Sequence, residues 1–481
     1  MRQTRIVCTI GPASCSAPML RELADAGMSV ARLNGSHADL DWHANAIALI
    51  RETLPDVPIL IDIPGRKIRT TGLAHEPSFK AGDVIILTTD TNHDGHEKVP
   101  VNYARLHEDL TAGDVVLADD GTLSFVVDKV DGADIHVRAD GPGTLKSRKG
   151  INVPFVTLNT ALVTDRDRHM VSFAREHGVD FIGISFVESA SHVEAIRELC
   201  GSDTPRIVSK VENQGGLDHV DEIVAATDAV MIDRGDLSVE TNIEQMALAQ
   251  KRILRAAASM GKPVIVATEM LHTMIDNPQP TKAEISDITN AVLDGCAATM
   301  LSGETAVGLY PVQAVSVMRR VAEAAEAHLQ DSLDGSLQPS PAEASREDVP
   351  QVMEDAIAMI CRRLPITKIV AITISGYAAR MIAARRPRQP ILAVSNDAMA
   401  ARSLNLLAGT QGIHVDIPFS RTSTDHIAQC MRELWERRYL EDDDMVLVNS
   451  LGYPRSGNRM NLLQTHSVSD LRETLDWQRR T

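Results

Sequence analysis

The sequence is poor in aromatic residues and its cysteines are not paired, and each absence excludes a class of protein. Aromatic side chains make up 3% of the 481 residues, which leaves few surfaces on which nucleic-acid bases could stack. The six cysteines are scattered and no CxxC motif occurs, so we expect no disulfide framework. A reducing cytoplasm is the simplest location for such a chain.

Long apolar runs and an excess of positive charge are also missing. No run approaches the roughly 18–20 apolar residues of a membrane-spanning helix, and the first ten residues do not resemble a signal peptide. The net charge is −17, from 48 Lys and Arg against 65 Asp and Glu. We therefore expect no nucleic-acid partner and no membrane partner, although a local basic pocket for a phosphorylated metabolite remains compatible with this charge.

The first two-thirds of the chain alternates short β-branched runs with amphipathic stretches of helical period. A length of 481 residues, 44% hydrophobic, predicts two to four folded domains. The predicted strands cover Arg5–Ile10, Ser29–Leu33, Pro58–Ile63, Phe181–Phe186, Arg206–Val211, Ala229–Ile232, Pro263–Thr268 and Ala298–Leu301. Eight such units predict an α/β fold, a (β/α)8 TIM barrel, with a doubly wound sheet as the competing architecture.

Two segments interrupt this alternation. Residues 71–150 are poor in helix signals and carry alternating strands between Asp-Gly turns, which predicts a small β-barrel lid inserted into the larger barrel. Residues 331–350 have the composition of a linker, and a second βα series follows it. The predicted domains are therefore a barrel from 1–70 and 151–330, the lid, the linker and a C-terminal α/β domain over 351–481.

Polar side chains follow all but the first of the predicted barrel strands, at the strand end where barrel enzymes carry their chemistry. They are Arg32, Asn34, Ser36, Asp62, Ser185, Lys210, Glu212, Asn213, Arg234, Gly235, Asp236, Thr268, Glu269, Ser302, Glu304 and Thr305. Any single one could be only a helix cap, and this alternative applies above all to Ser302 and Asp236. Capping does not easily explain so many strand ends with such groups together.

Lys210 and Glu212 are two residues apart on one strand and therefore share a face. A salt bridge is the simpler interpretation. The alternative is that Glu212 and Asp236 hold a hard divalent cation such as Mg²⁺, while Lys210 and Arg32 neutralise a phosphoryl group in transfer. The sequence contains no GxxxxGK[ST], GxGxxG, HExxH or GxSxG motif.

These residues lie in segments that resemble the pyruvate kinase family over essentially the whole chain. The segments are TRIVCTIGPAS (4–14), ARLNGSH (31–37), GINVP (150–154), SKVEN (209–213), RGDL (234–237), ATEML (267–271), NPQPTKAE (277–284) and MLSGETAVGLYP (300–311). The resemblance implies glycolytic phosphoryl transfer from phosphoenolpyruvate to ADP, giving pyruvate and ATP. It also implies a need for Mg²⁺, with Mn²⁺ as a substitute, usually K⁺, a phosphorylated-metabolite effector and a homotetramer.

The resemblance also implies a role for each matching residue. Lys210, Thr268, Arg32, Ser302 and Glu304 would act on the phosphoryl group, the enolate and the proton path. Glu212 and Asp236 would hold Mg²⁺, and Asn34, Ser36 and Asp62 would hold a monovalent cation. Arg69, His37, Lys149, Asp120 and the Gly235 turn would face the nucleotide.

Lys67 is the clearest departure from the family pattern. The stretch Asp62–Arg69 reads DIPGRKIR, and Lys67 replaces a glutamate beside the monovalent-cation site. In the family, lysine at this position marks members that do not need potassium, because its ammonium supplies the cation's charge internally. We expect activity that needs Mg²⁺ but not K⁺; a surface lysine is the simpler alternative.

Other departures concern the substrate and effector sites. Asp233 replaces an alanine near the expected substrate carboxylate, where a repulsion on the order of 3 kcal/mol would weaken binding. Glu188 and Glu269 replace an arginine and a glutamine. The loop Thr373–Ala378 resembles the family's sugar-phosphate loop but lacks its final hydroxyl, so we expect weak activation by fructose 1,6-bisphosphate. The alternatives are a paralogue retuned to another enol phosphate and a non-catalytic metabolite-binding homologue.

Overall fold

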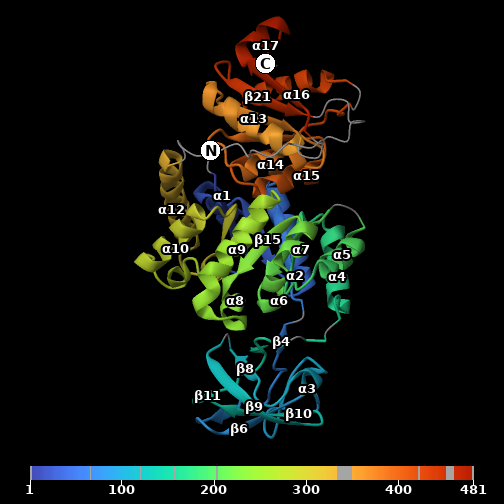
Figure 1. Cartoon of the computed structure of the whole chain (residues 1–481), viewed down its shortest axis with the longest axis vertical. Helices are drawn as coiled ribbons and strands as arrows, with labels where there is room; N and C mark the ends of the chain where they lie inside the picture. The colour runs from blue at the N-terminus through green and yellow to red at the C-terminus, as the bar shows by residue number, and fades with distance from the viewer. Residues whose placement is uncertain are drawn as a thin grey trace.

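The computed structural model describes residues 3–65, 67–119, 121–156, 158–159, 161–201, 204–332, 349–420, 423–450 and 460–478. Three parts are stacked along the long axis of the molecule (Figure 1). The lid lies at one end, the barrel in the middle and the C-terminal α/β part at the other end. No helix within the described ranges combines the length and the apolar character needed to cross a bilayer.

The middle part is a closed barrel of eight parallel strands, as the sequence predicts. The strands are β1 (Arg5–Thr9), β2 (Val30–Asn34), β3 (Ile59–Ile63), β13 (Phe181–Ile184), β14 (Arg206–Val211), β15 (Ala229–Asp233), β16 (Val264–Ala267) and β17 (Ala298–Leu301). They close in the order β1-β17-β16-β15-β14-β13-β3-β2. The predicted barrel is confirmed and the doubly wound alternative is wrong, because β1 pairs with both β2 and β17 and leaves no open edge.

Helices follow the barrel strands and cover the outside of the barrel. They are α1 (Ala17–Ala26), α2 (Leu40–Thr53), α4 (Asp165–Glu176), α5 (Ala190–Cys200), α6 (Gln214–Asp218), α7 (Val220–Ala226), α8 (Arg234–Glu240), η1 (Ile243–Gln245), α9 (Met246–Ser259), η2 (His272–Ile275), α10 (Lys282–Leu293), α11 (Gly303–Ala306) and α12 (Pro311–Ser332). Most strand residues are buried on both faces, so one core fills the barrel and another lies between strands and helices.

The lid consists of a seven-stranded sheet in the order β4-β12-β8-β9-β10-β6-β7 and a separate two-stranded sheet of β5 and β11. Its elements are β4 (Ile68–Arg69), β5 (Ser78–Phe79), β6 (Val84–Thr88), β7 (Val99–Pro100), α3 (Leu106–Asp109), β8 (Val115–Ala118), β9 (Leu123–Asp131), β10 (Asp134–Ala139), β11 (Gly143–Thr144) and β12 (Gly150–Asn152). A bridge between Thr70 and Val101 joins the two end strands, so the sheet curls almost closed around its own core. The chain enters through β4 and leaves through β12, and these two strands pair with each other.

The C-terminal part is a five-stranded sheet in the order β20-β19-β18-β21-β22. Its elements are α13 (Val349–Arg363), β18 (Lys368–Ile372), α14 (Tyr377–Ala384), β19 (Ile391–Ser395), α15 (Ala398–Ser403), η5 (Leu404–Leu406), β20 (Thr410–His414), α16 (Asp425–Glu436), β21 (Met445–Ser450), β22 (Leu462–Ser467) and α17 (Val468–Thr474). Thr410–Gly412, at the start of β20, pair with β19 despite their weak strand signal.

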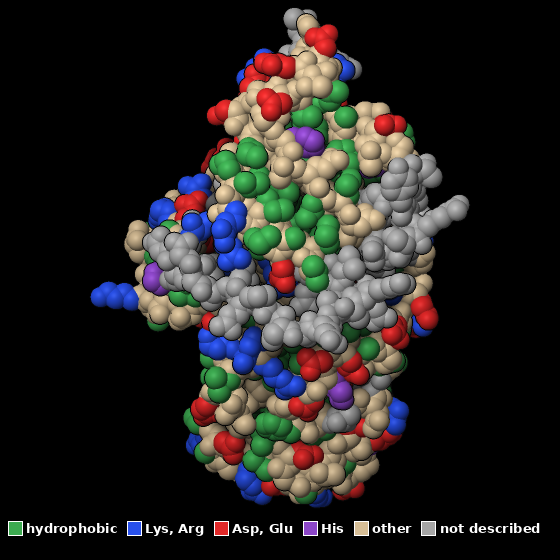
Figure 2. Space-filling view, turned by 45° about the horizontal axis from the view of Figure 1, so that its top comes forward, with side chains coloured by type: hydrophobic (Ala, Val, Ile, Leu, Met, Phe, Trp, Pro, Cys, Tyr) green, Lys and Arg blue, Asp and Glu red, His purple; other side chains and the backbone are tan. Residues whose placement is uncertain are grey.

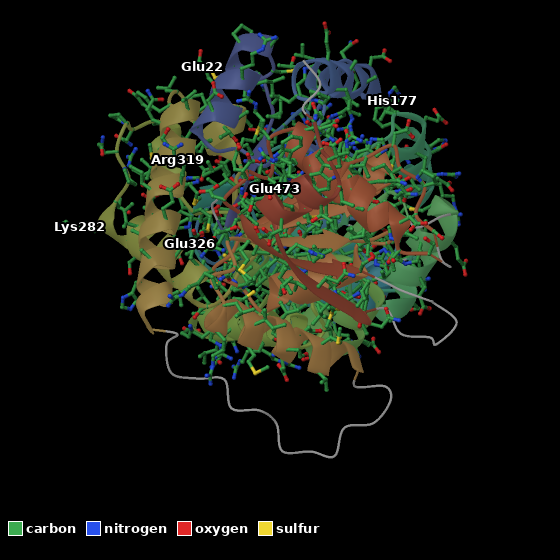
Figure 3. All side chains as sticks on the ribbon, turned by 90° about the horizontal axis from the view of Figure 1, so that it is seen from above. Glu22, His177, Lys282, Arg319, Glu326 and Glu473 are labelled. Atoms are coloured by element: carbon green, nitrogen blue, oxygen red, sulfur yellow. The ribbon has the colours of Figure 1, made fainter. Side chains whose placement is uncertain are left out.

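The C-terminal part closes the floor of the barrel, at the amino ends of its strands. Leu406 joins the core that fills the barrel interior and is 2% exposed. Asp180, just before β13, binds Arg51 of α2 at 2.5 Å and Arg402 of α15 at 2.9 Å. Seen from above, α12 runs beside this junction, where its Glu326 accepts the backbone NH groups of Gln3 and Thr4 (Figure 3). The two parts are therefore joined by apolar and charged contacts.

Candidate active site

The predicted catalytic residues meet at the carboxyl ends of the barrel strands, on the side that carries the lid. Arg32 comes from β2, Asp62 from β3, and Lys210 from β14 with Glu212 directly after it. Asp233 ends β15, and Asp236 lies in the first turn of α8. Because parallel strands expose their carboxyl ends at one face of a barrel, residues up to 200 positions apart in sequence become neighbours.

Lys210 is the centre of this group, and its side chain is 7% exposed. Its Nζ lies 2.7 Å from Glu212 Oε1, 3.1 Å from Asp233 Oδ2 and 3.6 Å from Asp62 Oδ2. Burial alone would disfavour the charged ammonium, but these carboxylates outweigh it and hold the pKa of Lys210 well above its usual range. Lys210 therefore stays a buried cation, as stabilisation of a phosphoryl group or an enolate requires.

Three carboxylates converge beside Lys210, one more than the sequence analysis assigned to the metal. Glu212, Asp233 and Asp236 each place one oxygen within 4.8 Å of the others. Burial raises the pKa of Glu212 to about 8, opposed by Lys210 and assisted by the negative charge of Asp233 and Asp236. A compact set of hard oxygen donors whose negative charges repel one another fits a small divalent cation such as Mg²⁺. Asp233 is the additional carboxylate. Its position at a strand end, next to the RGD turn, is the sequence signal that could have identified it.

The negative charge of Asp233 is paired with a neighbouring cation. Burial would raise its pKa, but Lys210 and Arg32 outweigh burial and bring the pKa to about 2, so the group stays ionised. Its oxygen lies 3.1 Å from Lys210 Nζ. The cation that pairs with Asp233 is thus Lys210, whereas the neighbouring Arg234 binds Asp287 at 2.6 Å.

Arg32 and the three residues predicted to hold a monovalent cation form the adjoining corner. Arg32 donates to Asp62 Oδ2 at 2.6 and 2.9 Å and to the hydroxyl of Thr9 at 3.0 Å. Asn34 pairs in register with Asp62 on the next strand, and its side-chain oxygen accepts the NH of Ser36. Asp62 Oδ1 is buried and accepts no hydrogen bond from the described residues. The structure therefore brings Asn34, Ser36 and Asp62 together.

Lys67 lies closer to the divalent site than the sequence predicts. Its ammonium forms an ion pair with Asp236, and both side chains are 17% exposed. The residue precedes β4, at the passage from barrel to lid, and its methylene chain lies over Gly150. Lys67 is therefore no surface lysine: it adds a positive charge to the carboxylate group.

Thr268, Gly235, Ser302 and Glu304 form the opposite wall. Thr268 Oγ1 accepts the NH of Gly235 at 2.8 Å, so the end of β16 is tied to the RGD turn. Thr268 and Glu269 both have positive φ, 64° and 54°, which is strain of the kind found at functional turns. The carboxylate of Glu304 accepts the NH of Ser302 at 2.7 Å and that of Leu271 at 3.1 Å. Ser302 Oγ is buried without a hydrogen-bond partner among the described residues.

The residues expected to face the nucleotide lie at the base of the lid. Arg69 of β4 pairs in register with Gly150, which directly follows Lys149. Burial lowers the pKa of His37, and the nearby charges of Arg69 and Arg32 lower it further. The ammonium of Lys149 binds Asp119 at 2.7 Å. Asp120, the remaining prediction, lies outside the described residues.

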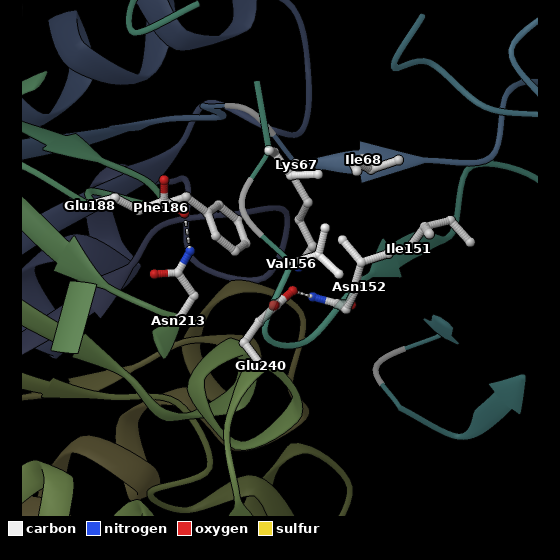
Figure 4. Close-up of a pocket in the computed structure, with 11 residues that line it drawn as sticks. Lys67, Ile68, Ile151, Asn152, Val156, Phe186, Glu188, Asn213 and Glu240 are labelled. Carbon is white, nitrogen blue, oxygen red and sulfur yellow. Dashed lines mark hydrogen bonds between the residues drawn. The ribbon is translucent and has the colours of Figure 1, made fainter. Parts of the chain in front are cut away.

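A cleft between barrel and lid contains residues that the sequence analysis missed (Figure 4). Asn152 of the lid donates to Glu240 of α8 at 2.5 Å, and Asn213 donates to Glu188 at 2.6 Å. Burial raises the pKa of Glu240 to about 7. Glu240 lies one helical turn after Asp236, and this spacing was the signal that could have identified it. Lys67 and Phe186 line the same cleft.

Comparison with known families and proteins decides the assignment. Residues 1–315 match the family described as pyruvate kinase, barrel domain, and residues 352–466 match pyruvate kinase, alpha/beta domain. The chain belongs to the pyruvate kinase family. The pyruvate kinases of Bacillus licheniformis and Geobacillus stearothermophilus are each 37% identical over 98% of this chain and 81% of their own length. That of Clostridium perfringens is 37% identical over 95% of this chain and 97% of its own.

A solved structure agrees with this family assignment. A pyruvate kinase from Cryptosporidium parvum superimposes with a TM-score of 0.85 at 32% identity, covering 97% of this chain and 96% of that one. The family and fold predicted from the sequence are thereby confirmed, and the chain is a phosphotransferase of the pyruvate kinase type. The roles of individual side chains, the domain limits and the cations are separate questions.

Proposed function

We propose that the protein transfers the phosphoryl group of phosphoenolpyruvate to ADP in the site around Lys210, with Mg²⁺ and without K⁺. The observation that carries this proposal is the buried ammonium of Lys210 among Glu212, Asp233 and Asp62, beside a group of carboxylates that fits a divalent cation. A cation held in a dry site stabilises charge that develops in a transition state far better than one in water.

The reaction needs a positive charge on both sides of the transferred group. The P–O bond of phosphoenolpyruvate breaks as a bond forms to an oxygen of the ADP β-phosphate, and the enolate left behind takes up a proton to give pyruvate. Lys210 and Arg32 would stabilise the phosphoryl group and the enolate. Glu212 and Asp236, with Asp233 adjacent, would hold Mg²⁺ (or Mn²⁺), which supplies charge neutralisation on phosphate and enolate oxygens.

Proton delivery to the enolate carbon is assigned to the wall opposite Lys210. Thr268 Oγ1 accepts the NH of Gly235, and the backbone NH of Ser302 donates to the carboxylate of Glu304. The hydroxyl of Ser302 has no hydrogen-bond partner among the described residues. A hydroxyl without a partner in the described structure can bind an ordered water that relays a proton. Arg69, His37, Lys149 and Asp120 are assigned to the nucleotide, on the lid side.

The position of Lys67 supports potassium independence. Its ion pair with Asp236 adds a fixed positive charge to the carboxylate group, in place of the charge of a monovalent cation. We expect pyruvate formation from phosphoenolpyruvate and ADP at on the order of 1–10³ per second. The rate should be equal in K⁺ and in K⁺-free buffer of the same ionic strength, and should vanish when Mg²⁺ is chelated.

The variant Lys67→Glu restores the residue typical of potassium-dependent members and tests the role of Lys67. We expect low activity in K⁺-free buffer and recovery on addition of K⁺, with Lys146→Glu in the lid as a matched charge control. Stimulation of the unmodified protein by K⁺ would refute this assignment. Such stimulation by K⁺ would not contradict the proposed phosphoryl transfer, because it presupposes turnover.

A second candidate substrate is another enol phosphate, favoured by Asp233 at the expected position of the substrate carboxylate. Absence of turnover with phosphoenolpyruvate in either buffer would favour this reading. Mg²⁺-dependent binding without product would instead favour a metabolite sensor.

The surface of the C-terminal part and the cysteines bear on assembly and location. Val352 and Met359 of α13 are 50% and 55% exposed and lie seven residues apart, hence on one helix face. Hydrophobic side chains gather on the face of the C-terminal part shown in Figure 2. Both features support a homotetramer, and the six free cysteines support the cytoplasm, where glycolysis occurs. Fructose 1,6-bisphosphate is expected to have little effect on the saturation curve.

A further inference from the structure

We propose that Glu240 of α8 is a positioning residue, which through Asn152 holds the lid in the orientation that phosphoryl transfer needs. Asn152 is the last residue of β12, the strand by which the chain leaves the lid, and Glu240 belongs to the barrel. Their hydrogen bond therefore joins the two parts between which the nucleotide is proposed to bind. The inference rests on the proposed function and adds to it a residue that acts through another side chain.

The contact between Asn152 and Glu240 is short and largely shielded from water. The side-chain nitrogen of Asn152 donates to Glu240 Oε1 at 2.5 Å, and the two side chains point toward each other across the cleft (Figure 4). Asn152 is 3% exposed. Within the described part of the chain, the Glu240 carboxylate accepts no other hydrogen bond. A hydrogen bond to a carboxylate is stronger than one between neutral groups, so this contact can hold two parts of the protein together.

The connection by which the chain enters the lid is held on the same helix. Lys67, directly before β4, forms its ion pair with Asp236, which lies four residues before Glu240 on α8. Residues four apart lie on one face of a helix, separated by one turn, about 5.4 Å along the axis. α8 therefore contacts both connections of the lid, and two points of attachment prevent the lid from turning about either one.

The two connections of the lid form one unit. Their strands, β4 and β12, pair with each other. An added Cβ at Gly150 would lie 3.2 Å from Lys67 Cε and 3.9 Å from Asn152 Oδ1, so both side chains lie on the same side of this strand pair. The absence of a side chain at Gly150 leaves the space in which Lys67 lies.

α8 is itself fixed to the barrel, so it can serve as a rigid support for the lid. Its Leu237 is fully buried in the core between the strands and the helices. The NH of Gly235 donates to Thr268 Oγ1 at 2.8 Å, which ties the first turn of α8 to the end of β16. A group held on α8 is therefore held relative to the candidate active site.

The two contacts of α8 differ in their relation to the proposed metal site. Asp236 belongs to the carboxylates that fit a divalent cation, whereas Glu240 lies outside that group. A divalent cation on Asp236 would compete with the ammonium of Lys67 for the same carboxylate, but it would not compete with Asn152. The bond between Asn152 and Glu240 is therefore the contact that keeps the nucleotide-facing side chains of the lid in a constant position relative to the metal carboxylates.

The test is steady-state kinetics in which phosphoenolpyruvate and ADP are varied separately. We expect Glu240→Ala and Asn152→Ala to raise the KM for ADP about tenfold or more, the effect of losing a hydrogen bond to a charged group, and to change the KM for phosphoenolpyruvate less than about twofold. Glu240→Gln keeps an oxygen that accepts the amide of Asn152 and should stay near the parent. Glu244→Ala removes an exposed carboxylate four residues further along and is the matched control.

Amide hydrogen exchange of residues 148–153, in the full chain without substrates, gives a second readout that needs no turnover. Faster exchange in Glu240→Ala and Asn152→Ala, but not in Glu240→Gln, supports the lid contact. Absence of turnover in the unmodified protein would overturn the proposed function, and this exchange pattern would still support the lid contact. An unchanged KM for ADP in both alanine variants of an active enzyme would overturn the positioning role. Asn152→Ala alone serves if Glu240→Ala does not fold.

Discussion

Asp233 and Glu212 both contact the ammonium of Lys210, yet their pKa values move in opposite directions. Burial raises the pKa of Glu212 to about 8, while Lys210 and Arg32 together overcome the effect of burial on Asp233 and bring its pKa to about 2. The negative charges of Asp233 and Asp236 add to the effect of burial on Glu212. At this scale Asp233 is the ionised member of the pair, and it neutralises part of the charge that Lys210 could offer a substrate.

Removing the Asp233 carboxylate should therefore improve the binding of phosphoenolpyruvate. The unscreened repulsion on the order of 3 kcal/mol is reduced by the Lys210 contact, so we expect Asp233→Ala to lower KM about tenfold in saturation curves. Asp233→Asn, which keeps the shape and removes the charge, should behave alike. A raised KM in both variants, with weaker Mn²⁺ binding by electron paramagnetic resonance, would instead make Asp233 a metal ligand.

Glu240 makes the stability of the protein depend on pH near neutrality. Its pKa rises from 4.5 to about 7 in the folded protein through burial, so between these values the folded chain holds a proton that the unfolded chain has lost. This contribution to stability is lost progressively as pH rises from about 4.5 to about 7. We expect Glu240→Gln to gain on the order of 1–2 kcal/mol relative to the parent between pH 5 and pH 8, measured by urea unfolding. A gap that stays constant over this range would contradict the assignment.

At the scale of elements, α10 begins with a capping box that ties three segments together. Thr281 Oγ1 accepts the NH of Glu284, and Glu284 accepts the NH groups of Thr281 and Thr273, both at 2.7 Å. Thr273 belongs to η2, which follows the active-site turn after β16. The start of this helix therefore supports the segment that follows Thr268 as well as its own first turn.

Loss of the Thr281 hydroxyl should cost about 1 kcal/mol, the usual value for a helix N-cap. Thr281→Ala is expected to lower the midpoint of urea unfolding accordingly. Thr289→Ala in the same helix is the matched control, because the hydroxyl of Thr289 only bonds back to the carbonyl of Ile285 and should contribute little. Equal losses for the two variants would show that the cap is not what stabilises α10.

Long periodic elements were predictable from the sequence, and short or irregular ones were not. The strands of the barrel and the amphipathic helices between them appear as expected, since their apolar periods are long enough to be read. The two-residue strands β4, β5, β7 and β11 carry no period, and β22 alternates too weakly to be seen. In the site, strand ends identified Lys210, Glu212 and Asp236, whereas the ion pairs of Lys67 and Asp233 depend on side-chain reach and needed coordinates.

At the scale of the whole molecule, Leu406 makes the C-terminal part an element of the barrel core. Its side chain is 2% exposed and packs with the residues that fill the barrel. Leu406→Ala should therefore destabilise the protein by about 2–5 kcal/mol. The unfolding transition of the barrel should be affected, and not only that of the C-terminal part. Leu364→Ala, at 41% exposure, is the control and should stay within about 0.5 kcal/mol of the parent. Separate transitions with an unchanged barrel would contradict this coupling.

The ion pair of Lys67 with Asp236 connects the attachment of the lid with the barrel. Lys67 sits on the strand passage through which the lid is attached, and Asp236 belongs to the barrel. A dissolved potassium ion reaches its site by diffusion, whatever the lid does. The ammonium of Lys67 is carried by the lid attachment, so it reaches Asp236 only in some lid orientations. The electrostatic field at the proposed metal site therefore depends on the lid angle. Such an enzyme would be insensitive to the salts of its surroundings and sensitive instead to anything that tilts its lid.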